Sequence, residues 1–242
     1  MRVHCASCPL RKQECFEDFD EAEEEFMEGF KTGELDVDPG SAVIMEGSTS
    51  PHLFTVLQGA GIRYKTLEDG RRQVIGFVFP GDFIGLQAAV MMEMEHTVEA
   101  TTKMLLCVFR RSDFHRMFTQ IPARGFDVAW LAAREEYFLG DHLLTVGRRN
   151  GLERVAFGIW AIHRRARDVG LATDTVMDMP FTQQNMADAL GLSLVHTNKT
   201  LRKLRRENVV KWHGRTLQII DPDKLFELAK VDDTPPRKRP LL

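Results

Sequence analysis

The sequence contains no run of 18 or more apolar residues, and no cationic stretch leads into an apolar segment near its start. Because a membrane-spanning helix needs about 20 apolar residues, no such helix is predicted, and a signal peptide is not supported either. Catalytic spacings are missing as well. The eight histidines are scattered without a His-x3-His pair, and no Gly-x-Ser-x-Gly elbow occurs. We therefore expect a cytoplasmic protein that has no membrane partner and is not an enzyme.

Cysteine is also scarce, with four residues in a chain of 242. Cys5, Cys8 and Cys15 fall close together near the start, whereas Cys107 stands alone in an apolar run. In a reducing compartment such thiols are metal ligands, redox thiols or buried core residues more often than structural disulfides. The arm that carries the first three cysteines is predicted to cover residues 1–20.

Charge is nearly balanced overall, at −3, but it is not balanced along the chain. Residues 1–150 contain 16 Lys and Arg against 24 Asp and Glu, whereas residues 151–242 contain 16 against 11. A molecule of this overall charge does not bind nucleic acid indiscriminately, although its second part is basic. The length favours two domains, and the charge distribution indicates different partners for them.

Brief β-prone runs follow an acidic segment at residues 21–28, which is predicted to form a short helix. Glu68, Asp69 and Gly70 are typical of a hairpin tip, since Asp-Gly readily takes a positive φ. Gly, Pro and Asp separate the runs, and short, regularly spaced strands of this kind predict a small β-barrel over residues 21–121. The runs cover residues 42–45, 53–57, 61–64, 74–79, 97–100 and 104–109.

A long helix is predicted over residues 122–147, with two apolar stripes. The simplest arrangement packs one stripe on the barrel of the same chain and the other on a second copy, as in a coiled coil. A fully buried core helix in a monomer is the alternative. The first stripe comprises Phe126, Trp130, Ala133, Tyr137 and Leu144. The residues predicted at the dimer interface, on the second stripe, are Ala132, Glu136, Leu139, Leu143 and Val146.

Glu136 is the single charge in the second stripe. Two such carboxylates facing each other across a dimer axis would repel or hold a proton, which makes this residue a candidate gate for dimerisation. A carboxylate that reaches solvent at the edge of the stripe is the alternative.

The stretch 182–204 combines a short apolar face, a turn glycine and basic residues, and it predicts a helix-turn-helix. Ser193 is suited to cap the second helix. Val195, Leu201 and Leu204 are expected to point inward, which leaves the polar side chains for base edges and phosphates. An ordinary α-hairpin with a solvated cationic face is the alternative.

A basic β-hairpin is predicted after this stretch, at residues 209–220. A DNA-reading helix followed by such a wing is a more specific signal than the helix pair alone, and it predicts a winged helix-turn-helix over residues 148–231. Residues 232–242 are Pro-rich and basic, and they are predicted to be a disordered tail that attracts phosphates. The predicted DNA-binding residues are Thr182, Ser193, His196, Thr197, Asn198, Lys199, Arg202, Lys203 and Arg215.

Two motifs in the predicted barrel match a known pattern. Residues 40–47 with 53–59 look like a β-roll signature, and the Phe-Pro-Gly-Asp-Phe-Ile-Gly run at 79–85 looks like the strand and turn that follow it. With the long helix and winged helix-turn-helix in the same order, the chain resembles the CRP/FNR superfamily of bacterial transcription regulators over nearly its whole length. The resemblance implies an α+β fold with an N-terminal cyclic-nucleotide-binding-like β-roll (a jelly-roll barrel), a long dimerisation helix and a C-terminal winged helix-turn-helix.

The resemblance also implies a sequence-specific regulator that binds a near-palindromic site on double-stranded DNA as a homodimer and contacts RNA polymerase. Members of the FNR branch usually contact bases through a Glu and a Ser-Arg pair on the recognition helix. This chain departs from that pattern, because residues 195–199 are Val-His-Thr-Asn-Lys. Val195 cannot accept a hydrogen bond from cytosine, so a different half-site is expected.

Within this family the cysteines and one barrel segment distinguish between effectors. Cyclic-nucleotide-binding members place an Arg-Ser or Arg-Thr pair at the cyclic phosphate, whereas residues 93–97 here carry acids, so cAMP is disfavoured. The layout of the cysteines is similar to that of FNR-type oxygen sensors, which hold a 4Fe–4S cluster with four thiolates. A regulator without a cluster, responding to a thiol redox change, another metal or an unidentified small molecule, is the alternative. The ligands that the resemblance implies are Cys5, Cys8, Cys15 and Cys107.

Overall fold

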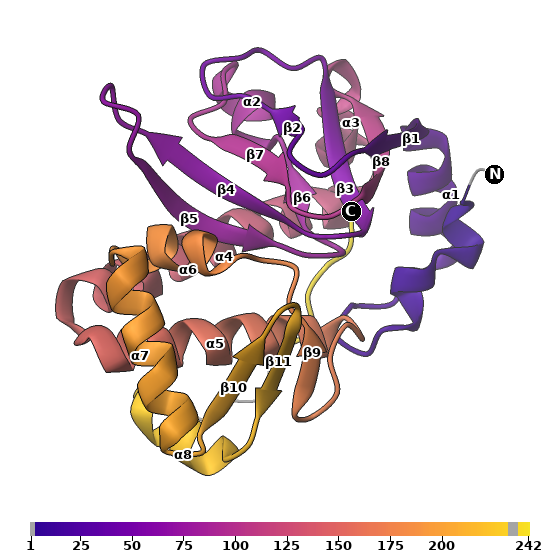
Figure 1. The fold of residues 1–242 in the computed structure, drawn as a ribbon. Helices are drawn as coiled ribbons and strands as arrows, with labels where there is room; N and C mark the ends of the chain where they lie inside the picture. Colours follow the sequence, from indigo (N-terminus) through magenta and orange to yellow (C-terminus); the bar gives the residue numbers. More distant parts are fainter. Residues whose placement is uncertain (1–2, 232–236) are drawn as a thin grey trace. The chain divides into compact units, whose positions relative to one another are not determined.

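The computed structural model describes residues 3–231 and 237–242. These residues form two compact units, which are described separately below (Figure 1). The first unit contains residues 3–65, 78–137 and 237–242, and the second contains residues 66–77 and 138–231. Among the described helices, none has the length and apolar character needed to cross a membrane.

Short antiparallel strands build the first unit, as the spacing of the β-prone runs predicts. One sheet has the order β1-β8-β3-β6 and the other has the order β2-β7-β4-β5. Val56, Val98 and Leu106 are fully buried in the core that both sheets share, which confirms the predicted β-roll. The strands are β1 (Lys31–Val37), β2 (Ala42–Ile44), β3 (His52–Gln58), β4 (Gly61–Thr66), β5 (Arg72–Val78), β6 (Phe83–Ile84), β7 (Thr97–Ala100) and β8 (Met104–Arg110).

The arm forms short helical turns and then a capped helix. The carboxylate of Asp20 accepts a hydrogen bond from Glu23 N at 2.8 Å, and the Glu23 side chain accepts one from Asp20 N at 3.0 Å. This capping box starts the acidic helix where the sequence predicts it. Phe30 at the end of the helix stacks on Phe109 of β8, with ring centroids 5.1 Å apart. The elements are η1 (Cys5–Ser7), η2 (Pro9–Lys12) and α1 (Glu21–Phe30).

The predicted long helix is present as α4 (Pro122–Arg148). The prediction that one apolar stripe packs on the barrel is wrong, because Phe126 and Tyr137 of the first stripe are 70% and 65% exposed. Arg124, Val128 and Leu131 are buried instead, and they lie on a third side of the helix. Apolar spacing did not reveal this face because it is partly polar. Three shorter helices lie between β6 and α4 among the described residues, namely α2 (Leu86–Met91), η3 (Arg111–Asp113) and α3 (Arg116–Thr119).

The second stripe of α4 is open in the single chain. Leu139 and Leu143 are 49% and 71% exposed, Ala132 and Glu136 are exposed as well, and Val146 is partly buried. Exposed apolar side chains that follow one side of a helix are typical of an interaction surface. The stripe is therefore available to a second copy, and the dimer itself stays a prediction.

The second unit is a winged helix-turn-helix, as predicted. Its three-stranded sheet has the order β10-β11-β9. Gly191 takes a left-handed conformation, with φ 62° and ψ 38°, at the turn between α6 and α7. Ile159, Met186 and Leu204 are fully buried in the helical core. The elements are α5 (Gly151–Asp168), β9 (Val176–Asp178), α6 (Gln183–Leu190), α7 (Leu194–Arg206), β10 (Val210–His213), β11 (Thr216–Ile219) and α8 (Pro222–Ala229).

Residues 66–77, at the tip of the β4-β5 hairpin, belong to the second unit, although the sequence pattern assigns them to the barrel. Arg72 Nε lies 2.7 Å from Asp188 Oδ2 of α6, and Gln73 Nε2 donates to Ala189 O at 2.9 Å. The division between the units also falls within α4, after residue 137, rather than between residues 147 and 148, where the sequence pattern separates the long helix from the winged helix-turn-helix. Both boundaries between the units are therefore determined by contacts between segments that lie far apart in the sequence.

Residues 239–242 belong to the first unit. The predicted disorder is wrong for this part of the tail, because Arg239, Leu241 and Leu242 are 5%, 4% and 4% exposed. Residues 232–236 lie outside the described residues. Basic and Pro-rich composition predicts disorder, but it does not show that Arg239 has a buried acidic partner, Asp82, elsewhere in the chain.

Candidate DNA-binding surface and cysteine site

The recognition helix α7 is capped by Ser193, whose Oγ accepts a hydrogen bond from His196 N at 3.2 Å. Leu201 and Leu204 are 8% and 0% exposed, and their spacing of three residues puts them on one side of the helix, as predicted. The side of α7 that faces away from this core is cationic. The exposed cations of α7 are Lys199, Arg202, Lys203, Arg205 and Arg206.

Two predictions about the first turns of α7 are wrong. Thr197, predicted to bind DNA, is fully buried, and its hydroxyl has no hydrogen-bond partner among the described residues. Val195, predicted to point inward, is 79% exposed. Thr197 lies four residues before Leu201 and so shares its buried side, whereas Val195 points to nearly the opposite side. Packing sets this rotation of the helix, and the short apolar pattern does not specify it.

The exposed polar residues of the first turns differ in how freely they project. The ring of His196 lies against the start of α5, because a Cβ added to Gly151 would come 2.4 Å from its Nε2. A larger residue at position 151 would therefore require the His196 ring to shift. Asn198 is partly buried and Lys199 is exposed.

Thr182 caps α6. Its Oγ1 accepts a hydrogen bond from Asn185 N at 3.0 Å, and Asn185 Oδ1 accepts one from Thr182 N at 2.8 Å. This capping box starts the first helix of the motif. Thr182 and Ser193 thus have structural roles at two helix starts, and their contact with DNA stays a prediction.

Arg215 lies on the wing beside an exposed acid. Its Nε and Nη2 lie 3.2 Å and 3.1 Å from the two carboxylate oxygens of Asp178, and the side chains are 68% and 66% exposed. An exposed ion pair contributes at most about 1 kcal/mol, so a phosphate can replace Asp178 at small cost. Gly214, with φ 57°, makes the turn of the wing next to Arg215.

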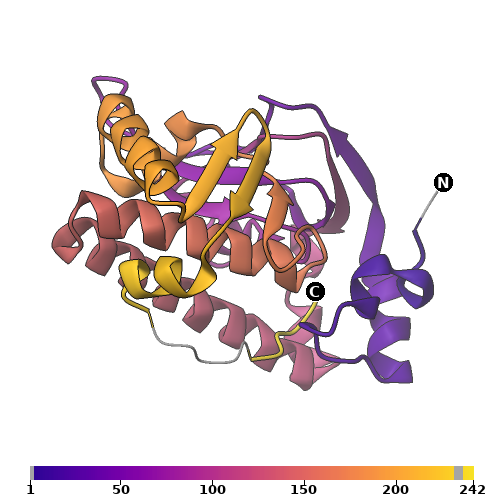
Figure 2. The same cartoon turned by 60° about the horizontal axis from the view of Figure 1, so that its bottom comes forward.

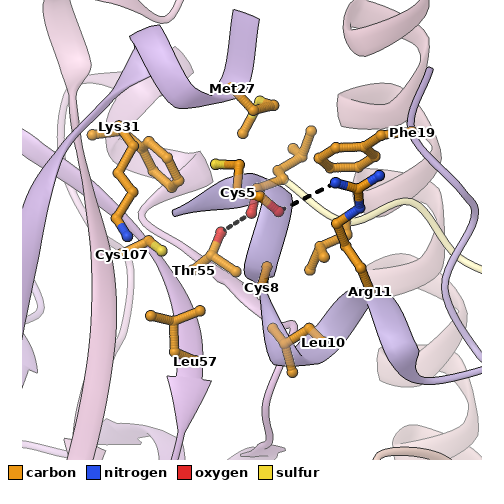
Figure 3. A pocket seen from close by; sticks show the side chains of 13 residues that line it. Cys5, Cys8, Leu10, Arg11, Phe19, Met27, Lys31, Thr55, Leu57 and Cys107 are labelled. Atoms are coloured by element: carbon orange, nitrogen blue, oxygen red, sulfur yellow. Dashed lines mark hydrogen bonds between the residues drawn. The ribbon is translucent and has the colours of Figure 1, made fainter. Parts of the chain in front are cut away.

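Cys5, Cys8 and Cys107 line one cavity of the first unit, and we name these three residues the cysteine site (Figure 3). Cys5 lies in η1, Cys8 lies between η1 and η2, and Cys107 lies in β8. The cavity has a volume of about 30 Å³. Cys15 is not among its lining residues. The structure therefore brings three of the four predicted ligands together.

Burial keeps two of these thiols protonated. It raises the pKa of Cys5 to about 12, and the charge of Glu28 beside it adds to the effect. Burial also raises the pKa of Cys107 to about 11, although Lys31 opposes the shift. Both groups are neutral thiols at pH 7, and their thiolates would need a nearby positive charge such as a bound metal.

Lys31 supplies a buried cation beside Cys107 (Figure 3). Its side chain is 1% exposed, and its Nζ lies 2.5 Å from Glu34 Oε1. Burial lowers the pKa of Lys31, but the hydrogen bond and charge of Glu34 outweigh burial, so the net pKa is raised. The ammonium group therefore stays charged next to Cys107 and partly stabilises its thiolate. No motif in the sequence marks Lys31 for this role.

Arg124 of α4 connects that helix to the arm. Its guanidinium lies 2.6 Å from Glu23 Oε1 of α1 and 4.6 Å over the ring of Phe19. Its Nη1 donates to Leu241 O at 3.1 Å. The partners lie 101 and 117 positions away along the chain, so no local pattern could identify them. Arg124 therefore joins α4 to α1, to Phe19 and to the 239–242 end of the chain.

The donor chemistry of the cysteine site fits an iron–sulfur cluster, because thiolates are the ligands of such clusters. Its geometry holds three thiols rather than four. No group of three or more His, Cys, Asp or Glu side chains in residues 3–231 and 237–242 is placed to hold a metal ion. The cavity has room for about one water molecule. A cluster therefore requires the arm to rearrange so that Cys15 joins the other three.

The barrel segment that a cyclic phosphate would face contains Glu95 and His96. Burial lowers the pKa of His96 to about 4, helped by the charges of Arg63 and Lys65, so its ring is neutral at pH 7. Arg63 forms an ion pair with Glu135 of α4, and Lys65 lies 3.7 Å from Glu95. The expectation that this domain does not take cAMP stays a prediction.

Comparison with known proteins covers both units. The cyclic nucleotide-binding domain family matches residues 34–120, and the Crp-like helix-turn-helix domain family matches residues 153–228. The chain is 29% identical to the nitrogen fixation regulation protein FixK of Bradyrhizobium diazoefficiens, covering 93% of each chain. It is 30% identical to the transcriptional activator protein FnrL of Cereibacter sphaeroides, covering 94% of this chain and 92% of FnrL. The solved structure of FixK2 from Bradyrhizobium japonicum superimposes with a TM-score of 0.75 at 26% identity, covering 82% of this chain and 98% of FixK2.

Proposed function

The chain belongs to the CRP/FNR family of transcription regulators, and we propose that its cysteine site makes it a sensor of oxygen or redox state. The family places it among DNA-binding regulators and not among enzymes. The observation that carries the proposal is the convergence of Cys5, Cys8 and Cys107, from two distant segments, on one buried cavity.

The cofactor that we propose is a 4Fe–4S cluster held by the cysteine site, with Cys15 of the same arm as fourth ligand. Such a cluster would supply an oxidant-sensitive group at this position. The chain provides three thiols on one cavity, of which those of Cys5 and Cys107 are kept neutral by raised pKa values, and it provides the Lys31 ammonium beside Cys107. Arg124 carries a change in the arm to α4, because it contacts both α1 and the carbonyl of Leu241.

For DNA recognition we propose a homodimer formed through the exposed second stripe of α4. The two recognition helices would then enter successive major grooves of a near-palindromic site, about 34 Å apart. The exposed apolar side chains of Leu139 and Leu143 support this use of the stripe. A contact with RNA polymerase is part of the same proposal, as the family implies it.

The outward side of α7 provides the reading residues. Val195 is suited to an apolar contact with a thymine methyl group, since it is the exposed aliphatic side chain of the first turn. His196, Asn198 and Lys199 follow as hydrogen-bonding groups for base edges. Arg202, Lys203 and, on the wing, Arg215 are suited to phosphates, which fix the register of the protein on the duplex.

A second candidate is a thiol switch in the same cavity without a cluster. The observation that favours it is the room for only about one water molecule between the three thiols. In this case an oxidant would join two thiols as a disulfide, with loss of two electrons and two protons to the oxidant. DNA binding and the dimer are common to both candidates.

Purification without oxygen separates the two candidates. A brown protein with about four irons per chain, which loses its colour and its operator affinity in air, supports the cluster. The variant Cys15→Ser serves as the matched test of the fourth ligand, and its iron content is expected to fall while its fold is kept. A colourless, iron-free protein with intact DNA binding would refute the cluster and leave the thiol switch.

A further inference from the structure

Residues 239–242, which we name the 239–242 segment, follow α8 in the chain but pack on the first unit. Arg239 forms a parallel β-bridge with Phe16 of the arm. Its N donates to Cys15 O and its O accepts from Glu17 N, both at 2.9 Å. Figure 2 shows this end of the chain beside the arm. The arm and the 239–242 segment are therefore joined through main-chain hydrogen bonds.

A buried ion pair anchors the 239–242 segment. Arg239 Nη1 lies 2.8 Å from Asp82 Oδ1, and both side chains are 6% exposed. The second guanidinium nitrogen donates to Pro80 O at 2.9 Å. Asp82 Oδ2 in turn accepts from Phe79 N at 2.9 Å. Hydrogen bonds to several partners compensate the desolvation of both charges, which is the condition under which a buried pair holds one geometry.

The anchored segment forms part of the wall of the cavity at the cysteine site. Leu241 and Leu242 line this cavity, and each is 4% exposed. Thr55 donates a hydrogen bond to the carbonyl of Leu242, and Arg124 donates one to the carbonyl of Leu241. The two leucines thus place apolar side chains at the cavity with the three thiols, and their main chain is fixed at two points.

We propose that the 239–242 segment is a latch over the cysteine site, and that its release controls the access of iron, oxidants and other thiol reagents to the three thiols. The role of the latch in sensing rests on the proposed function of this site. The control of access to the thiols does not depend on that function. The arm and the 239–242 segment both border the cavity. The 239–242 segment is the shorter of the two, and the arm has an additional attachment because it continues into α1.

Site-resolved alkylation of the reduced, metal-free full-length protein tests the latch. The rate of reaction of each cysteine with N-ethylmaleimide is measured by mass spectrometry for the wild type, for Arg239→Ala and for a chain that ends at Lys238. We expect the rates at Cys5, Cys8 and Cys107 to rise at least tenfold in both variants. The matched control is Lys238→Ala, whose exposed side chain precedes the anchor and whose rates are expected to stay within twofold of the wild type.

A second variant covers the case in which loss of the buried anchor unfolds the first unit. The double change Leu241→Ser with Leu242→Ser keeps the Arg239–Asp82 pair and removes only the apolar cover. It is expected to keep the circular dichroism spectrum of the wild type below a lowered thermal midpoint, since two buried leucines are lost, and to raise the three rates at least tenfold in the folded state. Unchanged rates in this folded variant would overturn the latch.

The proposed cluster and the latch fail in different experiments. An iron-free wild type whose three thiols are protected, and become reactive in the variants, would refute the cluster and support the latch. An iron-loaded wild type combined with unchanged thiol rates in the folded double variant would refute the latch alone.

Discussion

The DNA-binding surface and the cysteine site place their functional groups in opposite surroundings. On α7 the cations stand in water on the outer side of a capped helix, while Thr197, Leu201 and Leu204 hold the inner side. In the first unit the thiols of the cysteine site line a small cavity, and burial keeps those of Cys5 and Cys107 protonated. The cations of the recognition surface are exposed to a partner, whereas the thiols are at least partly withdrawn from solvent.

Two arginine–aspartate pairs show the same contrast with similar chemistry. Arg215 and Asp178 on the wing are 68% and 66% exposed, whereas Arg239 and Asp82 are both 6% exposed. Water competes for the first pair and is excluded from the second. The exposed pair is therefore suited to exchange its acid for a phosphate, and the buried pair is suited to hold a segment in place.

The largest expected effect comes from breaking the buried pair. Arg239→Ala leaves the carboxylate of Asp82 buried without its cation, and we expect a loss of about 3–5 kcal/mol in the free energy of unfolding of the first unit. Arg215→Ala is the matched control, expected to change the free energy of unfolding of the second unit by no more than about 0.5 kcal/mol while weakening DNA binding. Urea unfolding followed by circular dichroism measures both. Equal losses in the two variants would remove the contrast between them.

The next effect is a pH dependence that belongs to the cysteine site alone. The pKa of Cys107 is raised from its ordinary 9.0 to about 11, so the folded state holds the proton more tightly than the unfolded state does. Stability is therefore complete below pH 9 and is lost as the pH rises towards 11, by about 2–3 kcal/mol in total. Subtracting the urea-unfolding profile of Cys107→Ser from that of the wild type isolates this contribution. A flat difference between pH 8 and 11 would show that Cys107 is not buried as described.

On the recognition surface, two substitutions distinguish the recognition of bases from the electrostatic attraction of phosphates. Val195→Ala is expected to cost about 1 kcal/mol at one base pair, because the shorter side chain no longer reaches a thymine methyl group, with little change at other positions. Lys203→Ala is expected to weaken all sequences alike and to lower the salt slope of binding by about 1, since one phosphate is no longer neutralised. Fluorescence anisotropy with a set of single-base operator variants at several salt concentrations measures both. Uniform weakening by Val195→Ala would remove its assignment as a reading residue.

The smallest expected effect concerns Glu136. Replacing it with Leu removes a charge from the proposed dimer seam, where repulsion between two exposed carboxylates is worth about 1 kcal/mol. We expect severalfold tighter dimerisation in air by analytical ultracentrifugation. Unchanged dimerisation and DNA binding would show that Glu136 reaches solvent at the edge of the stripe and is not a gate.

Local rules predicted the elements of both regions and failed where packing decides orientation. Asp-Gly at the hairpin tip, the capping residue Ser193 and Gly191 between the helices act within a few positions of themselves, so their roles were predictable. The cap that Thr182 forms was not predicted, although it also acts locally. The inward pair Leu201 and Leu204 was predicted as well. The placements of Val195 and Thr197 were wrong, because a helix with a short apolar face can rotate by one residue without breaking its pattern.

Long-range contacts of the first unit were out of reach of the sequence pattern. The position of Arg124 carried no signal, since its acidic partner Glu23 lies 101 positions earlier. The 239–242 segment was assigned to a disordered tail, because composition is silent about a buried Asp82 some 157 positions away. Cys107 was predicted to join the arm only through the resemblance to FNR-type sensors, and the structure places it beside Cys5 and Cys8 but not with Cys15.

The sequence by itself determined a β-roll, a long helix and a winged helix-turn-helix in that order, because hydrophobic spacing, turn residues and caps act over short distances. It also determined that the second part of the chain is basic. Only the tertiary structure decided which side of α4 stays open, which residues of α7 face outward, and that Leu241 and Leu242 line the cavity of three thiols. These features depend on which buried groups meet between separate elements of the chain, and a local sequence pattern does not contain that information.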